Sequence, residues 1–460
     1  MPYKHGNNKL QEQKSIYAGG IKVKHPVSRR NFVKWGIAGA IGLSVNGISS
    51  SALPNDPKRT VRIGLIGIGG RGYTLLSTLM GMENLAFPAV CDIKPDRVAA
   101  ARKMLAEHGH PQPEGYGRDE WAFTELTARD DLDAIIIATP WNWHTPMAIS
   151  AMKAGKFVGV EVPAAITLKE CWELVHTSEK YGVPCMMLEN WSFRRDNLAV
   201  LKMIRAGLFG ETVHAHCAYS HDAAAYFFNP DGTPTWRGKF LEQKNRDHYP
   251  THSLGPVLSW MNINCGDRFD TLTSTATGSF GTNQYFRDKY GPDHPLAKRK
   301  IKQGDVVTTV VKTLNGKSIV IFNDMQLPRP YDNQWMIQGT EGIYDHKREA
   351  LYLSGKSPQD HQWEPFAPYQ EKYDHAWWKN TPSDIQNQGH GGCDYLVLRE
   401  FVNAVRMKTP PPIDVYDSVT MSCIVPLSEA SIAKNSAPVH CPDFMHGKWK
   451  TIKPHFALET

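Results

Sequence analysis

Residues 61–72 constrain the fold of this chain more than any other stretch. An apolar run, residues 61–66, leads into the pattern Gly67-x-Gly69-x-x-Gly72, and a helix-like segment follows. In such a pattern the first glycine allows a tight turn, the second lets the backbone approach a pyrophosphate, and the third lets the helix pack on its strand. The start of that helix adds unpaired N–H groups that attract an anion. The pattern therefore predicts the phosphate-binding turn of a dinucleotide-binding domain.

A second predicted strand ends in an acid, Asp92, twenty residues after the glycine turn. A carboxylate at this place can bind the ribose 2′-OH of NAD and repels the 2′-phosphate of NADP. Asp92 could instead be only a turn residue at the end of a strand. Because strand, turn, helix and acid occur in the expected order, we predict an NAD site. The expected ligands at this end of the site are Gly67, Gly69, Gly70, Arg71, Gly72 and Asp92.

Residues 59–190 alternate between strand-like and helix-like segments. The run Asp133-Ala-Ile-Ile-Ile-Ala-Thr139 has the pattern of a parallel strand buried on both faces. Residues 156–161 and 183–189 are predicted to be two further strands, and a helix is expected from Pro146 to Ala154. This alternation predicts a doubly wound parallel sheet, the Rossmann fold, over residues 55–193.

From Arg194 the pattern changes to strands with alternating polarity. Strands are expected at 212–219, 269–277, 306–312 and 318–322, and helices at 197–206, 395–406 and 417–433. Asn315-Gly316 between the last two strands is a hairpin signal. The fold class is therefore α/β, with a Rossmann domain followed by an α+β domain at 194–460. The second domain is expected to carry an open, mainly antiparallel sheet, the substrate contacts and the contacts of a homo-oligomer.

The first 54 residues account for the net positive charge of the chain. The net charge of +6 includes +7 from this region, with eight Lys or Arg and one Glu, which leaves −1 for the rest. A near-neutral body argues against a nucleic-acid partner. Ser28-Arg29-Arg30-Asn31-Phe32 and the weakly apolar run after it resemble a twin-arginine export signal. A disordered basic tail is the alternative.

An export signal predicts a periplasmic or secreted protein. No segment approaches the length of a membrane span, so we expect no stable membrane insertion of the mature chain. The eight cysteines lack CxxC pairs, and several lie in apolar patterns. We therefore predict mostly free, buried thiols. His214 and His216 share one strand face, but no acid or cysteine stands at ligand spacing, and no metal site is expected.

Candidate site residues follow from the order of the elements. Dinucleotide and substrate meet at the carboxyl ends of parallel strands. The side chains that the prediction places there are Asn142, His144, Glu161 and Asn190. The second domain must close the site, and its conspicuous polar and aromatic stretches are Tyr249-Pro-Thr-His252 and Arg329-Pro-Tyr331.

These motifs resemble one family in particular, glycoside hydrolase family 109, within the glucose–fructose oxidoreductase-like (Gfo/Idh/MocA) superfamily. The similar stretches are Gly64-Leu-Ile-Gly-x-Gly-x-Arg-Gly72, Gly159-Val-Glu-Val-Pro163, Leu188-Glu-Asn190, Tyr249-Pro-Thr-His252, Arg329-Pro-Tyr331 and Gly389-His-Gly-Gly-x-Asp-Tyr395. They cover nearly the whole chain. Sugar dehydrogenases of the superfamily have Glu-Lys-Pro at the strand end, where this chain has Val162 in place of lysine.

The resemblance implies an NAD-dependent α-N-acetylgalactosaminidase that acts on a small-molecule or glycan substrate. It implies oxidation at C3, elimination, addition of water and reduction, without net redox. Glu161, Tyr249, His252 and Tyr331 fall on the family's substrate-site positions and are the candidate catalytic residues. His252 is the first candidate for proton transfer.

One position departs from the family pattern. The family has a tyrosine where this chain has Phe193, which puts the activity and the preferred sugar in question. Two alternatives therefore stay open. One is a sugar oxidoreductase with net hydride transfer, and the other is a non-catalytic sugar-binding protein that retains NAD.

Overall fold

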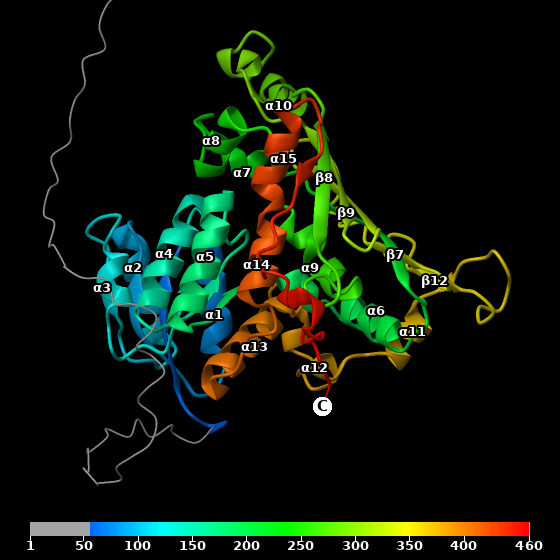
Figure 1. Cartoon of the computed structure of the whole chain (residues 1–460). Helices are drawn as coiled ribbons and strands as arrows, with labels where there is room; N and C mark the ends of the chain where they lie inside the picture. Colours follow the sequence, from blue (N-terminus) through cyan, green and yellow to red (C-terminus); the bar gives the residue numbers. More distant parts are fainter. Residues whose placement is uncertain (1–55, 460) are drawn as a thin grey trace, which may run out of the picture. The chain divides into compact units, whose positions relative to one another are not determined.

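The computed structural model describes residues 56–459, which form two β-sheets with helices packed against them (Figure 1). The first sheet has six strands in the order β3-β2-β1-β4-β5-β6, and every neighbouring pair is parallel. Its strands are β1 (Val61–Ile66), β2 (Leu85–Cys91), β3 (Glu114–Tyr116), β4 (Ala134–Ile137), β5 (Phe157–Val160) and β6 (Cys185–Met187). This order is that of the Rossmann fold, and the predicted doubly wound sheet is confirmed.

Helices connect these strands and cover the sheet. They are α1 (Gly70–Met80), α2 (Pro95–Glu107), α3 (Phe123–Thr127), α4 (Trp141–Lys153) and α5 (Leu168–Tyr181). All four residues of β4 are buried, as a strand covered on both faces requires. At the start of α5, the Thr167 hydroxyl accepts a hydrogen bond from the Glu170 N–H, and the Glu170 carboxylate accepts one from the Ile166 N–H.

Two predicted helix boundaries were wrong. Helix α4 begins at Trp141 rather than at Pro146, because Trp141 and His144 are buried and Pro146 removes only one backbone donor near the start of the helix. The helix expected over 417–433 is divided into α14 (Val415–Ser422) and α15 (Ile424–Ile432). Pro426 lacks the N–H that would continue the hydrogen-bond ladder to Ser422, and the helix is interrupted at Cys423, between these two residues.

The second sheet has nine strands in the order β14-β13-β12-β11-β7-β10-β9-β8-β15. They are β7 (Thr212–Ser220), β8 (Phe269–Ala276), β9 (Val306–Thr313), β10 (Ser318–Asp324), β11 (Met336–Gly339), β12 (Gly342–Asp345), β13 (Ala350–Leu353), β14 (Glu364–Pro365) and β15 (Val439–His440). Only β7 and β10 are parallel neighbours, so the expected mainly antiparallel sheet is confirmed. Strands β9 and β10 form the predicted hairpin, with Gly316 at φ +85° in its turn.

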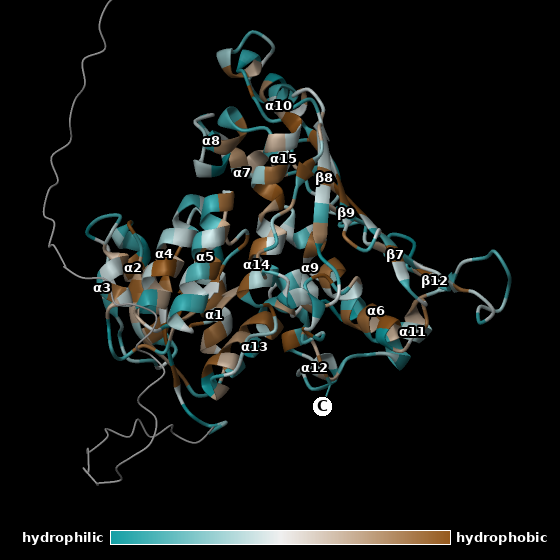
Figure 2. Cartoon of the chain, in the orientation of Figure 1, coloured by the Kyte–Doolittle hydropathy of each residue, from teal (hydrophilic) through white to brown (hydrophobic). Residues whose placement is uncertain are grey.

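The part of the chain that carries the second sheet also contains further helices. They are α6 (Arg195–Arg205), α7 (Ala224–Phe227), α8 (Trp236–Gln243), α9 (Thr251–Trp260), α10 (Gly281–Tyr290), α11 (Ala367–Lys372) and α12 (Ala376–Lys379), with the short 3₁₀ helix η1 (Asn190–Phe193) before α6. Figure 2 shows hydrophobic and hydrophilic residues in alternating bands along α6. Its hydrophobic residues, such as Leu198 and Leu201, are buried, which accounts for the stability of this amphipathic helix.

The last helices return to the first sheet. Helix α13 (Cys393–Met407) brings Phe401 against β5, where a Cβ on Gly159 would lie 3.2 Å from the Phe401 ring. Two serine hydroxyls of α14 accept hydrogen bonds from backbone N–H groups in or near the first sheet. Ser422 accepts from the Ala164 N–H at 3.1 Å, and Ser418 accepts from the Met187 N–H at 3.0 Å. The C-terminal segment therefore positions residues at the carboxyl ends of β5 and β6.

All eight cysteines are free, and seven are buried while Cys265 is partly exposed, in agreement with the prediction. Within residues 56–459 no helix is long and apolar enough to cross a membrane. The predicted twin-arginine signal lies outside the residues that the structure describes.

Candidate active site

A cavity of about 570 Å³ lies at the carboxyl ends of the parallel strands. It extends from Asp92, after β2, across the glycine turn to Glu161, after β5, and to His252 on α9. The strand order reverses between β1 and β4, and a Rossmann fold binds its dinucleotide at this switch point.

The glycine turn is shaped for close approach of a ligand and of its own helix. Gly67 has φ +87°, and a Cβ there would lie 2.7 Å from the carbonyl oxygen of Ala138. A Cβ on Gly72 would lie only 1.8 Å from the carbonyl oxygen of Gly67. Gly69 and Gly70 line the cavity, and a Cβ on Gly70 would meet nothing within 4 Å. The turn therefore leaves room at the start of α1 for phosphates.

Asp92 lies at the predicted place and is held in position. Its side chain accepts a 2.7 Å hydrogen bond from the Ile68 N–H and a 2.9 Å bond from the Lys94 N–H. Arg97, which sequence reasoning did not single out, lies 3.6 Å from the same carboxylate and also lines the cavity. At the other end, Asn190 lines the cavity, and its Oδ1 is buried without a hydrogen-bond partner. The turn, the acid and this acceptor fit NAD.

Arg71 and Glu161 belong to a largely buried ion network. The Arg71 guanidinium donates to Glu161 at 2.6 Å and to both oxygens of Asp394 at 2.7 and 3.0 Å. Asp394 also accepts from Asn190 at 2.8 Å and contacts Nδ1 of His390 at 2.8 Å. Burial opposes ionisation of Asp394, but the bonds from His390 and Arg71 outweigh it and hold its pKa below the usual value. Arg71 therefore uses its donors mainly on carboxylates and fixes Glu161 at the cavity wall.

His252 forms a pair with a buried acid. Its Nδ1 lies 2.6 Å from Oε2 of Glu189, while the other oxygen of Glu189 accepts a 2.7 Å bond from the Trp191 N–H. A carboxylate only accepts hydrogen bonds, so Nδ1 of His252 carries the proton and Nε2 of the neutral ring can accept one. Glu189 was quoted from the sequence only as part of a motif. Its position two residues after the end of β6 was the signal that could have identified it.

Two tyrosines lie near His252. The Tyr249 ring is 5.0 Å from that of His252, and the Tyr219 ring is 4.7 Å from that of Tyr249. Burial raises the pKa of the Tyr249 and Tyr219 phenols, and the nearby Arg237 offsets only part of this rise. Both phenols are therefore neutral at ordinary pH and can donate hydrogen bonds. Tyr219 and Arg237 line the cavity but were not predicted.

Tyr331 lies beside these residues rather than in the cavity wall. It is 40% exposed, and its ring is 5.7 Å from that of Tyr219 and 5.9 Å from that of Trp191. Tyr331 therefore packs on the solvent side of Tyr219 and Trp191, where it can reach a large substrate.

Two residues that were predicted to bind the cofactor have environments that differ from the expected one. Asn142 is exposed on α4 and does not line the cavity. His144 lines it, but both ring nitrogens face backbone carbonyl oxygens, of Pro163 and of Thr139, at 2.8 Å. His144 therefore joins the segments that follow β4 and β5. Val162 is 2% exposed in the cavity wall.

Phe193 points away from the cavity. It is fully buried, its ring stacks on Trp377 at 5.3 Å, and it also contacts Phe456. The missing tyrosine hydroxyl would therefore lie in the protein interior. Trp191, two residues earlier, approaches the site instead, with its ring centroid 6.0 Å from that of His252.

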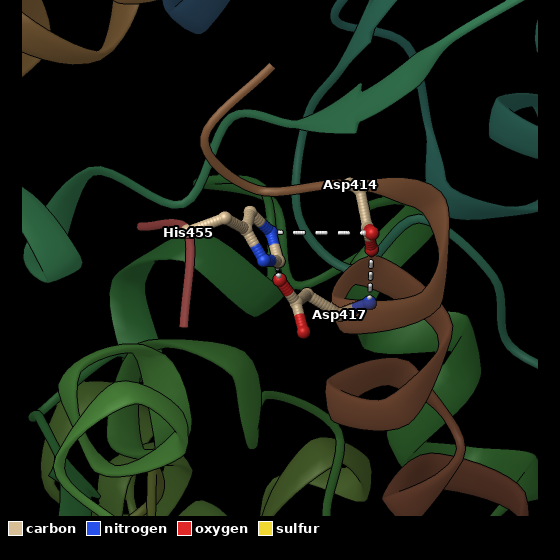
Figure 3. Close-up of side chains that lie close together, drawn as sticks. All are labelled: Asp414, Asp417 and His455. Carbon is tan, nitrogen blue, oxygen red and sulfur yellow. Dashed lines mark hydrogen bonds and ion pairs between the residues drawn. The ribbon is translucent and has the colours of Figure 1, made fainter. Parts of the chain in front are cut away.

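Among residues 56–459, three side chains are close enough to hold a metal ion: Asp414, Asp417 and His455 (Figure 3). Asp414 caps α14 by accepting from the Asp417 N–H, and Asp417 accepts from Asn264. Nε2 of His455 lies 3.5 Å from Asp417 and 4.0 Å from Asp414. Each residue thus has a structural partner, and the absence of a metal stays a prediction.

The fold and the cavity define an NAD-binding protein. The sequence profile of the oxidoreductase family with an NAD-binding Rossmann fold matches residues 61–189. Several solved structures share this fold. They include an NAD binding oxidoreductase from Klebsiella pneumoniae, at TM-score 0.65 and 19% identity, which covers 83% of this chain and 98% of its own. Another is levoglucosan dehydrogenase in complex with NADH, at TM-score 0.63 and 18% identity, which covers 84% of this chain and 100% of its own.

The rest of the chain identifies the family. The profile described as glycosyl hydrolase 109, C-terminal domain, matches residues 193–451. A glycosyl hydrolase family 109 protein of Stenotrophomonas maltophilia is 41% identical over 89% of this chain and 96% of its own length. The alpha-N-acetylgalactosaminidase of Tannerella forsythia is 39% identical over 94% of this chain and 99% of its own. The chain belongs to glycosyl hydrolase family 109 and is an NAD-dependent glycoside hydrolase.

Proposed function

We propose that this enzyme hydrolyses terminal α-N-acetylgalactosamine, or a related sugar, through oxidation, elimination, water addition and reduction without net redox. The observation that carries the proposal is the His252–Glu189 pair at the cavity end opposite Asp92. The printed activity of the Tannerella forsythia relative supports the choice of sugar. The glycine turn and Asp92 would hold NAD, which would supply reversible hydride transfer at C3 of the sugar, and oxidation at C3 makes the proton at C2 acidic.

The chain's own residues then serve the elimination. Glu189 orients His252, so that its Nε2 can take the proton from C2 while the C1 substituent leaves with the C1–O electron pair. The Tyr249 phenol can donate a hydrogen bond to the sugar beside His252. Glu161, fixed by Arg71, can accept one from a sugar hydroxyl or from the nicotinamide side.

Val162 supports hydrolysis over net oxidation. A lysine at this place would supply a proton-transfer group, whereas valine supplies none.

We also propose export by the twin-arginine route, because the Arg29-Arg30 pair precedes an apolar run. An exported enzyme has no ready supply of fresh NAD, and a cycle that regenerates its cofactor suits that location.

Release of p-nitrophenol from p-nitrophenyl α- and β-N-acetylgalactosaminides tests this function, with purified protein of measured NAD content and no NAD added. The proposal predicts repeated turnover of the α anomer. No release from protein that holds NAD would overturn it. Accumulation of NADH with a free sugar, only when NAD is supplied, would establish the oxidoreductase alternative.

A further inference from the structure

A second cavity of about 580 Å³ adjoins the active site, and the proposed function gives it no role. Its wall is built by Arg194 and the start of α6, by β12 and α11, and by residues 386–393, which lead into α13. Side chains of sugar-binding type line it, among them Arg194, Asp196, Glu349, Gln370, Trp378 and Asn387.

One residue, His390, lines both cavities. It has φ +49°, within a run of positive φ values from Gly389 to Gly392. Left-handed backbone is unfavourable for a histidine, so the surrounding structure must impose this conformation. Nδ1 of His390 contacts Asp394, which leaves Nε2 of the neutral ring as a hydrogen-bond acceptor.

Trp191 adjoins the same boundary. Its ring lies 6.0 Å from His252 and 5.5 Å from His390, and Arg194 packs 5.2 Å from its centroid. His390 and Trp191 thus connect the His252–Glu189 pair with the second cavity. A molecule that extends from His252 past His390 would enter this cavity.

The charges of the second cavity are largely paired. Arg194 donates two hydrogen bonds to Asp196, which also contacts His346 at 3.1 Å, and Arg195 donates two to Asp374. Burial favours the neutral acid, but Arg194 and His346 hold the pKa of Asp196 below its usual value. Paired charges with additional amides and an aromatic ring suit a neutral polyhydroxylated ligand better than an anion.

We propose that the second cavity is the subsite for the sugar on the reducing side of the scissile bond, with His390 beside the glycosidic oxygen. This inference rests on the proposed function and specifies its substrate as a glycan rather than a glycoside with a small aglycone. His390 accepts a hydrogen bond from a hydroxyl of the reducing-side sugar, and Gln370 and Asn387 bind that sugar farther out.

Two neighbouring residues of α11 provide a matched pair of variants. Gln370→Trp places a large ring in the cavity, whereas Glu371→Trp changes an exposed residue outside it. The substrates are p-nitrophenyl α-N-acetylgalactosaminide and an α-N-acetylgalactosaminyl-galactose disaccharide. We expect Gln370→Trp to lower kcat/KM for the disaccharide about tenfold or more, mainly through KM, and to leave the p-nitrophenyl glycoside nearly unchanged. Glu371→Trp should change neither.

His390→Asn removes the imidazole and keeps a residue that tolerates positive φ. It should lower kcat/KM for the disaccharide more than for the p-nitrophenyl glycoside. The affinity of the NAD-loaded protein for the disaccharide, measured by calorimetry, tests the existence of the subsite independently of turnover. Equal affinity in wild type and Gln370→Trp, or no binding by wild type, would overturn the subsite. Binding that Gln370→Trp weakens, without cleavage of either substrate, would support the subsite and overturn only the proposed function.

Discussion

Nδ1 of His252 lies 2.6 Å from Oε2 of Glu189, and this bond joins the start of α9 to the segment between β6 and η1. Glu189 is fully buried and has His252 and the Trp191 N–H as partners. The pair gives the histidine a defined tautomer, because the carboxylate accepts the Nδ1 proton. In the proposed elimination, proton transfer by His252 therefore depends on Glu189.

Glu189→Gln should lower kcat about 100-fold with little change in KM, because an amide no longer selects the productive tautomer of His252. Steady-state kinetics on the p-nitrophenyl α-glycoside, with NAD content measured in parallel, checks this. Glu173→Gln, at a surface ion pair with Lys169, is the matched control and should behave as wild type. An unchanged kcat in Glu189→Gln would show that His252 acts without its partner.

Gly72→Ala should weaken NAD binding about tenfold or more. The added Cβ would lie 1.8 Å from the backbone oxygen of Gly67, so α1 must move away from the turn that holds the phosphates. Fluorescence titration of cofactor-free protein with NAD measures the effect. Gly81→Ala, at the other end of α1, places its Cβ at an ordinary 3.5 Å from Thr78 and should bind NAD normally. Normal affinity in Gly72→Ala would place the dinucleotide elsewhere.

Phe193→Tyr should not raise the activity, although it restores the family residue. Its hydroxyl would be buried among Trp377 and Phe456, and we expect a loss of about 1–3 kcal/mol in the free energy of unfolding. Urea denaturation and kcat measure the two effects. Phe280→Tyr, at a residue 68% exposed, is the control and should change neither. A large gain in kcat with Phe193→Tyr would mean that position 193 reaches the sugar.

His455→Gln should destabilise the protein in a pH-dependent way. The hydrogen bond and charge of Asp417 raise the pKa of His455 to about 9. A raised histidine pKa contributes stability that is fully present below the unfolded value, near 6.5, and is lost as the pH rises through about 9. Because a third of the side chain is exposed, we expect a difference of about 1 kcal/mol at pH 6.

Thermal unfolding of His455→Gln and wild type between pH 6 and pH 10 measures this difference. His361→Gln, at an exposed histidine, serves as the control. A difference that grows with pH would contradict the assignment of His455 as the cation of this cluster.

Local patterns predicted the first sheet well, because its turn and its buried strands are continuous in sequence. The glycine turn and Asp92 lie as expected at the ends of β1 and β2. Strands β11 to β15 were not anticipated, since segments of two to four residues carry too little periodicity. The division between α14 and α15 was missed because the hydrophobic pattern continues across it.

The site was predicted less completely because its polar contacts span the chain. Asp394, the partner of Arg71, is 323 residues away, and Glu189 is 63 residues from His252. No spacing rule connects such pairs before the fold is known. The same limit applies to Tyr219 and Arg237, which reach the cavity only because β7 and α8 lie beside it. Phe193 illustrates a second limit. A residue can align with a family motif in sequence, but the alignment does not show where its side chain points.

The proposed cycle requires removal of the proton at C2 of the sugar. Hydrolysis of p-nitrophenyl α-N-acetylgalactosaminide in D₂O, without added NAD, tests this step through the isotope content of the released sugar. Because the proton removed at C2 exchanges with solvent before water adds, we predict deuterium at C2 of the product. Hydrolysis with C2 fully protonated would contradict elimination and indicate direct displacement at C1.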